Sequence, residues 1–122
     1  MIIGMAVGLP AARGGKVKAL GVTSLARSPA APELPTLSES GLPGFEVLNW
    51  MGVIAPARMP AEIMSRLNGD IRAILQSSDV RERLLKQGLE PAPMTPEAFD
   101  MLIRSEIARW SAVVKEAGIK PD

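Results

Sequence analysis

The sequence predicts an α/β fold from three observations. Two short segments, residues 16–24 and 47–55, are rich in β-branched and bulky apolar side chains, which is typical of buried strands. Later in the chain, apolar residues recur at every third or fourth position, as they do on one face of an amphipathic helix. A proline-rich connection over residues 25–45 separates the two strands and prevents long regular structure there.

The first twelve residues, MIIGMAVGLPAA, are apolar but do not have the form of a secretory signal. No basic segment precedes them, Gly4 and Gly8 interrupt the run, and Arg13 stands where a cleavage site requires small residues. We therefore expect no signal peptide in this chain. The segment is interpreted as the end of a buried helix or loop, closed by Gly14 and Gly15.

Both strands and their connection carry local signals for turns. The first strand ends in Thr23 and Ser24, and in the connection the sequence Thr-Leu-Ser-Glu over residues 36–39 has the form of a capping box. This pattern predicts one helical turn that ends at Gly41. Gly52, inside the second strand, indicates a bulge or a close approach to the backbone.

Two helices are predicted directly after the second strand. Pro60 suits the first turn of the earlier one, because its missing N–H has no partner to lose there. A short helix over residues 81–87 follows, for which Asp79 and Glu82 are the expected caps. The earlier helix is expected to bury the stripe formed by Ile63, Leu67, Ile71 and Ile74.

The longest helix is predicted to start at Thr95, with Pro96 in the first helical position. Gly118 and Pro121 are expected to end it. Its apolar face is expected to lie in the core and consists of Phe99, Leu102, Ile103, Ile107, Trp110, Val113 and Val114.

Two strands alone make a poor sheet, and strands this apolar need partners along their edges and helices on both faces. The sequence therefore predicts that a missing amino-terminal segment or another chain completes the sheet.

Composition excludes several classes of function. The 122 residues include no Cys and no His, so thiol and imidazole catalysis, disulfides and most zinc or copper sites are excluded. A net charge of +1 and 3% aromatic residues argue against nucleic-acid binding. No Ser-x-x-Lys spacing or other catalytic set occurs, and no apolar run reaches the roughly 18 residues of a membrane span. We expect no enzyme, no cofactor and no metal site.

Several motifs, in order along nearly the whole chain, resemble one known family. They are Gly15–Ser24, Arg27-Ser28, Leu34–Phe45, Asn49–Gly52, Ala55-Pro56, Leu67-Asn68, Gly88–Pro91, Thr95–Glu97 and Ile103–Trp110. This series resembles the tripartite tricarboxylate transporter substrate-binding proteins, the Bug or TctC-like periplasmic receptors. Met51 departs from it, because an aromatic residue is usual at that position.

The resemblance implies a carboxyl-terminal fragment of a two-lobed periplasmic-binding-protein fold of type II. Residues 1–46 would then be the end of the second lobe with its proline-rich crossing, and residues 47–122 the carboxyl-terminal segment of the first lobe. The parent protein would be a periplasmic solute-binding component that captures a small organic carboxylate for a membrane permease. Backbone N–H groups at loop and helix ends suit that task.

The matching positions nearest the expected crossings between lobes are Thr23, Ser24, Asn49 and Trp50. They are our candidates for lining the ligand cleft, with strand-end capping and core packing as the alternative roles. Two other interpretations of the chain stay open at this stage. It could be an interaction module, for which Arg104 and Arg109 offer surface tests, or a non-functional remnant that binds no ligand of its own.

Overall fold

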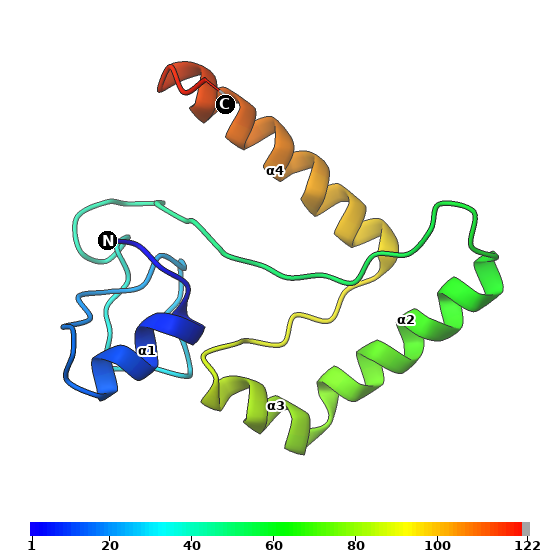
Figure 1. Cartoon of the computed structure of the whole chain (residues 1–122), viewed down its shortest axis with the longest axis horizontal. Helices are drawn as coiled ribbons and strands as arrows, with labels where there is room; N and C mark the ends of the chain where they lie inside the picture. Colours follow the sequence, from blue (N-terminus) through cyan, green and yellow to red (C-terminus); the bar gives the residue numbers. More distant parts are fainter. Residues whose placement is uncertain (121–122) are drawn as a thin grey trace.

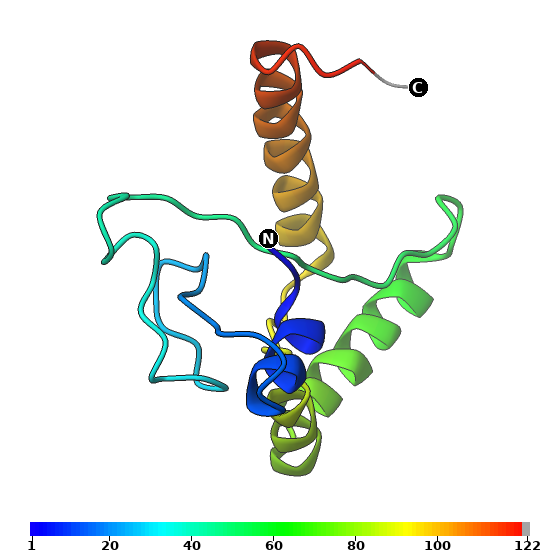
Figure 2. The same ribbon diagram turned by 60° about the vertical axis from the view of Figure 1, so that its left-hand side comes forward.

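In the computed structural model, which describes residues 1–120, there are four α-helices (Figure 1). The helices are α1 (Met5–Arg13), α2 (Ala61–Gln76), α3 (Ser78–Lys86) and α4 (Pro96–Glu116). Helices α2 and α3 are separated by one residue, and the others by longer irregular segments. In both views α4 extends away from the other three helices (Figures 1 and 2). Between Met1 and Lys120, no helix is both long enough and apolar enough to cross a membrane.

The predicted end of the first apolar segment is confirmed. Helix α1 follows Gly4 and ends at Gly14, and Gly15 has a φ of +71°, a conformation that glycine adopts without strain. Leu9 is the buried residue of this helix. The burial expected for the segment therefore applies to that one side chain.

Neither predicted strand, 16–24 or 47–55, forms a ladder within residues 1–120, so the strand predictions are wrong for this chain taken by itself. Val22 makes one isolated parallel bridge with Thr36. In it the Val22 N–H donates to the Pro35 carbonyl at 2.9 Å, and the Leu37 N–H donates to the Val22 carbonyl at 2.9 Å. Local sequence favours an extended backbone, but a strand also needs a neighbour to pair with, and the described residues supply none.

The predicted capping box in the connection is confirmed. The Thr36 N–H donates to Glu39 Oε2 at 3.1 Å, and the Glu39 N–H donates back to Thr36 Oγ1 at 3.0 Å. The Ser40 N–H reaches the Thr36 carbonyl at 3.1 Å, and Gly41 follows with a φ of +109°. The result is a single turn rather than a helix, held at its start by these two reciprocal bonds.

Acid should loosen this turn. Acceptance of the Thr36 N–H lowers the pKa of Glu39 below its ordinary value of 4.5, and the nearby Arg27 guanidinium, 3.0 Å away, lowers it further. Because the folded pKa is depressed, the stabilisation is complete above pH 4.5 and is lost as the pH falls through the folded value. We expect the protection factor of the Thr36 amide, its exchange rate relative to the intrinsic rate at each pH, to fall at low pH in NMR hydrogen-exchange measurements. Glu39→Gln keeps the acceptor but cannot ionise, so a pH response that survives in this variant would contradict the assignment.

The core is small and lies within residues 1–46. Among the described residues, the buried hydrophobic side chains are Leu9, Val22 and Ala31, and the buried polar ones are Ser28 and Thr36. The core therefore joins α1 to the proline-rich connection and leaves the later helices outside it.

Two contacts tie residues 1–46 to the segment after α3. The buried Ser28 hydroxyl donates to Glu90 Oε1 at 2.5 Å. The backbone of α1 also lies against Gly88, where an added Cβ would come within 3.0 Å of the Met5 carbonyl carbon. Gly88 has a φ of +73°, so both its conformation and its close contact require glycine.

Helices α2 and α3 meet at Ser77, and this junction corrects two expected caps. Ser77 has an extended ψ of 141°, its hydroxyl donates to the Ile74 carbonyl at 2.6 Å, and its carbonyl accepts the Arg81 N–H at 3.0 Å. Helix α3 therefore starts at Ser78, three residues before the predicted start. Asp79 lies in its first turn, and Glu82 pairs with Lys86 at 2.6 Å instead of capping. Pro60, expected inside the preceding helix, is the residue before its first turn.

Helix α4 begins as predicted, with Thr95 Oγ1 accepting the Ala98 N–H at 3.2 Å and Pro96 in the first turn. It ends at Glu116, shortly before Gly118, whose φ is +64°. Pro121, the other expected stop, lies outside the described residues.

The predicted burial of the helix stripes is wrong for this chain. Helices α2, α3 and α4 contain no buried residue. The spacing of the apolar positions does produce amphipathic helices, but within residues 1–120 their faces are only partly covered, for example where Trp50 packs against Phe99. Apolar residues that remain at least one-third exposed include Ile63, Leu67, Ile74, Ile107, Trp110, Val113 and Val114.

Candidate functional site

Two of the four predicted cleft residues, Asn49 and Trp50, lie together in a shallow hollow of about 430 Å³ between residues 48–50 and α4. Thr23 and Ser24 are not part of its lining. The complete lining is Leu48, Asn49, Trp50, Ile103, Glu106, Ile107 and Trp110.

The walls of this hollow are mainly apolar. Trp50 makes an edge-to-face contact with Phe99, with ring centroids 5.4 Å apart. Glu106 accepts the Trp110 indole N–H at 2.8 Å, and its other oxygen lies 3.6 Å from the Arg109 guanidinium. The lining includes one carboxylate and no cation, and that carboxylate is already engaged by Trp110 and Arg109.

Thr23, near the end of residues 16–24, is hydrogen-bonded to the start of residues 47–55. Its hydroxyl donates to the Val47 carbonyl at 2.6 Å, and its own carbonyl accepts the Val47 N–H at 3.0 Å. The side chain is partly buried. In this conformation the hydroxyl proton is committed to the backbone, which leaves the oxygen lone pairs for any further contact.

Thr23→Val should release the backbone at Val47. The substitution keeps the shape of the side chain and removes a hydrogen bond whose net contribution is about 1 kcal/mol. We expect the Val47 amide to exchange about fivefold faster, measured by hydrogen exchange, while Thr23→Ser behaves like the original residue. Equal protection of Val47 in the valine and serine variants would show that the hydroxyl does not hold these two segments together.

Ser24 makes a local hydrogen bond, and Asn49 lies close to the residue before α1. The Ser24 hydroxyl donates to the Ala26 carbonyl at 2.7 Å, which makes a local turn. The Asn49 amide lies against the residue that precedes α1, because a Cβ added at Gly4 would be 3.1 Å from Asn49 Nδ2. Asn49 thus lies where residues 47–55 pass the start of α1.

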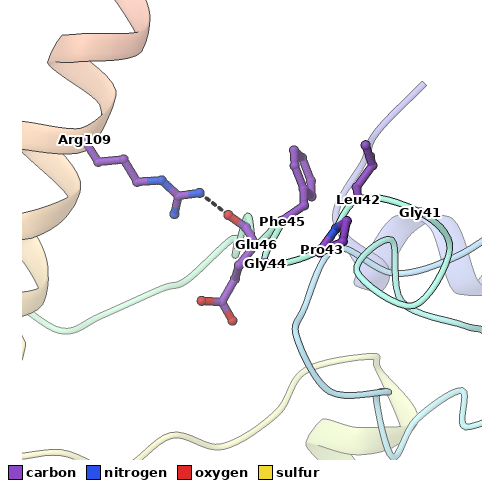
Figure 3. A pocket seen from close by; sticks show the side chains of 7 residues that line it. All are labelled: Gly41, Leu42, Pro43, Gly44, Phe45, Glu46 and Arg109. Carbon is purple, nitrogen blue, oxygen red and sulfur yellow. Dashed lines mark hydrogen bonds between the residues drawn. The ribbon is translucent and has the colours of Figure 1, made fainter.

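A second hollow, of about 440 Å³, lies where residues 41–46 face α4 (Figure 3). Arg109 reaches across it from α4 and donates to the main-chain carbonyl of Glu46. In Figure 3 the Glu46 carboxylate points away from this bond. The lining consists of Gly41, Leu42, Pro43, Gly44, Phe45, Glu46 and Arg109.

Sequence reasoning did not assign Arg109 to a hollow, because its partner is 63 residues earlier in the chain. The available signal was its place in the motif over residues 103–110. A guanidinium is the side chain best suited to a carboxylate, and Arg109 is the cation of this lining. Here its N–H groups already contact the Glu46 carbonyl and Glu106, and its carbon Cζ lies 5.6 Å from the Trp110 ring centroid. The bond to Glu46 joins α4 to the residue after the connection, and the other two contacts lie within α4.

A metal centre is not present among the described residues, since no group of three or more Asp or Glu side chains gathers there. Neither hollow combines a nucleophile with a base. Both hollows offer surfaces for binding.

Comparison with known proteins identifies the fold. Residues 1–119 match the profile of the tripartite tricarboxylate transporter family receptor, TctC. The chain is 46% identical over 102 residues to the UPF0065 protein of the tcbD-tcbE intergenic region of Pseudomonas sp. strain P51. That match includes 83% of this chain and 30% of the relative, so the chain spans about a third of the length of such proteins.

Three solved structures share the fold. Rpa4515 of R. palustris, solved with adipate, is 36% identical with a TM-score of 0.85, over 97% of this chain and 40% of that one. The periplasmic binding protein BugD is 35% identical with a TM-score of 0.80, over 93% and 39%. MatC of Rhodopseudomonas palustris, solved with malate, is 42% identical with a TM-score of 0.75, over 90% and 38%.

These matches confirm the predicted fold class, a portion of a two-lobed periplasmic-binding-protein fold. Each solved chain is more than twice as long as the part that this chain matches. The chain belongs to the tripartite tricarboxylate transporter receptor family, TctC.

Proposed function

We propose that this chain is part of a periplasmic receptor that captures a small organic carboxylate and delivers it to the membrane permease of a tripartite tricarboxylate transporter. The observation that carries the proposal is the match of 97% of the chain, at a TM-score of 0.85, to a protein solved with adipate. The malate in MatC supports the same ligand class.

In this proposal residues 1–46 end the second lobe and residues 47–122 form the carboxyl-terminal segment of the first. The small core inside residues 1–46 supports a separate unit there. The paired bonds between Thr23 and Val47 lie at the proposed boundary, where a crossing between lobes needs a fixed geometry. Thr23, Ser24, Asn49 and Trp50 all lie within a few residues of that crossing and are the proposed cleft residues.

Binding is best tested in a single polypeptide in which this chain replaces the matching part of Rpa4515. We expect calorimetry to detect binding of adipate or malate. Asn49→Ala should weaken binding at least about tenfold, because a hydrogen bond to a charged group contributes about 1.5–3 kcal/mol. Asn68→Ala is the matched control, since the Asn68 amide donates to the Met94 carbonyl at 3.1 Å, away from the crossing.

A folded chimera that binds no carboxylate would overturn the proposed function. Equal binding by the Asn49 and Asn68 variants would remove Asn49 from the proposed cleft. The transporter role has its own test, which is uptake of labelled carboxylate by cells that carry the gene. We expect deletion of the gene to abolish the high-affinity component of uptake and a plasmid copy to restore it.

A further inference from the structure

One peptide group, between Glu46 and Val47, is held from both sides by hydrogen bonds. Its N–H, on Val47, donates to the Thr23 carbonyl at 3.0 Å. Its C=O, on Glu46, accepts a bond from the Arg109 guanidinium of α4 (Figure 3). Because a peptide group is planar, bonds to both its N–H and its C=O fix the orientation of the whole plane. One bond comes from residues 1–46 and the other from α4.

Arg109 is the link between this peptide and α4. Within residues 1–120, no other side chain of α4 makes a hydrogen bond to a residue outside the helix. Arg104, on the same helix, pairs locally with Asp100 at 2.7 Å. Helix α4 also contains no buried residue. The bond from Arg109 is therefore the polar contact through which an α4 side chain reaches the end of residues 1–46.

Two neighbours on α4 orient the Arg109 side chain. The guanidinium lies 3.6 Å from Glu106, and its carbon Cζ lies 5.6 Å from the centroid of the Trp110 ring. The Trp110 indole N–H donates to the other oxygen of Glu106 at 2.8 Å, which holds that carboxylate in place. A planar guanidinium that is oriented in this way loses less rotamer freedom when it forms a further hydrogen bond. Helix α4 thus presents a preorganised donor to the Glu46 carbonyl.

The packing on both sides of the held peptide is loose. The hollow of about 440 Å³ is lined by residues 41–46 and Arg109, and the hollow of about 430 Å³ by residues 48–50 and side chains of α4. The chain before and after the peptide therefore has room to move. The peptide itself cannot turn relative to both residues 1–46 and α4 unless one of its two bonds breaks.

We propose that the Glu46–Val47 peptide is the pivot between the two proposed lobes, and that Arg109 is a positioning residue that limits the orientations the lobes can take. The inference deepens the proposed function, from which it takes the boundary after residue 46 and a carboxylate bound between lobes that close on it. A pivot with few accessible orientations loses little conformational entropy when the lobes close, so it favours tight binding. Arg109 thereby raises the affinity without contacting the ligand.

Distance measurements in the Rpa4515 chimera test the pivot. The 122 residues contain no cysteine, so Glu33→Cys and Asp70→Cys place one spin label in each proposed lobe, both at exposed positions. Any cysteine of the Rpa4515 part is replaced by serine. In double electron–electron resonance without ligand, we expect Arg109→Gln to broaden the distribution of label distances. Arg104→Gln removes the same charge from the same helix, so it is the matched control and should leave the distribution unchanged.

Binding gives the second readout. In calorimetry, Arg109→Gln should weaken adipate binding about fivefold or more, as is typical of coupling between separate sites, whereas Arg104→Gln should bind like the unsubstituted chimera. Arg109→Lys keeps a cationic donor and should return both the distance distribution and the affinity toward their original values. Thermal unfolding of each variant separates these effects from a general loss of stability.

The pivot is wrong if the Arg109→Gln and Arg104→Gln variants have equal distance distributions. It is also wrong if Arg109→Gln lowers the melting temperature and changes neither the distribution nor the affinity, because Arg109 is then merely structural. A broader distribution with unchanged adipate affinity would overturn the effect on binding. A folded chimera that binds neither adipate nor malate would overturn the proposed function, while the label distances, measured without ligand, still test Arg109. The two failures are therefore distinguishable.

Discussion

We expect the isolated 122-residue chain to unfold without a cooperative heat-absorption peak. Its buried hydrophobic side chains among the described residues are Leu9, Val22 and Ala31, which cannot offset a conformational entropy cost of about 1–2 kcal/mol per residue. The surface of 9512 Å² is far above the value of about 6,300 Å² for a compact monomer of this mass. Differential scanning calorimetry, with binding of a hydrophobic dye as a second readout, measures this directly.

The Rpa4515 chimera, the single polypeptide that contains this chain, is the control for this experiment. It should show a sharp transition and little dye binding, because residues 48–55 and the apolar face of α4 are then covered. A sharp transition of the chain alone, with an enthalpy near the value of about 0.7 kcal/mol per residue that is typical of folded domains, would contradict the expectation. It would mean that residues 1–120 fold as a unit despite their exposed apolar faces.

The second large effect is expected at Gly52. A Cβ added there would lie 2.2 Å from Phe99 Cζ and within 3.0 Å of two more atoms of the same ring. Real side chains do not approach so closely, so Gly52→Ala must displace the ring and with it the edge-to-face contact to Trp50. We expect a loss of about 1–3 kcal/mol, the usual cost of overpacking, and a lower melting temperature of the Rpa4515 chimera.

Gly69→Ala is a matched control with the opposite expected sign. Gly69 lies inside α2, and an added Cβ there meets nothing within 4 Å. Alanine in a helix interior is favoured over glycine by about 0.5–1 kcal/mol, so this variant should melt at a higher temperature. If both alanine variants shift the melting temperature in the same direction, the close approach at Gly52 does not limit the packing of Phe99.

Features that depend on neighbours in sequence could be predicted from the sequence. The start of α4 at Thr95, the reciprocal bonds between Thr36 and Glu39, and the end of α1 at Gly14 all involve groups within five residues of one another. The close approach at Gly52 was also indicated, although the contact turned out to be the Phe99 ring, 47 positions later. Glycine marks the place of such a contact but not its partner.

The start of α3 was predicted less accurately than the start of α4. Asp79 and Glu82 are good caps in principle, but α3 begins at Ser78, directly after the extended Ser77, whose hydroxyl donates to the Ile74 carbonyl of α2. Competition between nearby polar residues for the same helix end decides such boundaries, and the sequence pattern does not rank them.

For the candidate site, sequence placed four residues near one crossing, and their role in ligand binding stays a prediction. The tertiary structure brings Asn49 and Trp50 into one hollow against α4 and assigns the Thr23 hydroxyl to Val47. The contacts that place Arg109 at one hollow and Phe99 beside the other join them to residues more than 40 positions away. Such contacts have no local signature.

The sequence by itself determined the family and the approximate positions of the three later helices. These depend on motifs and on the 3.6-residue period. Only the tertiary structure decided which apolar groups are buried. Burial is a property of what surrounds a side chain. Within residues 1–120, most of the predicted core side chains on α2, α4 and residues 48–55 are exposed.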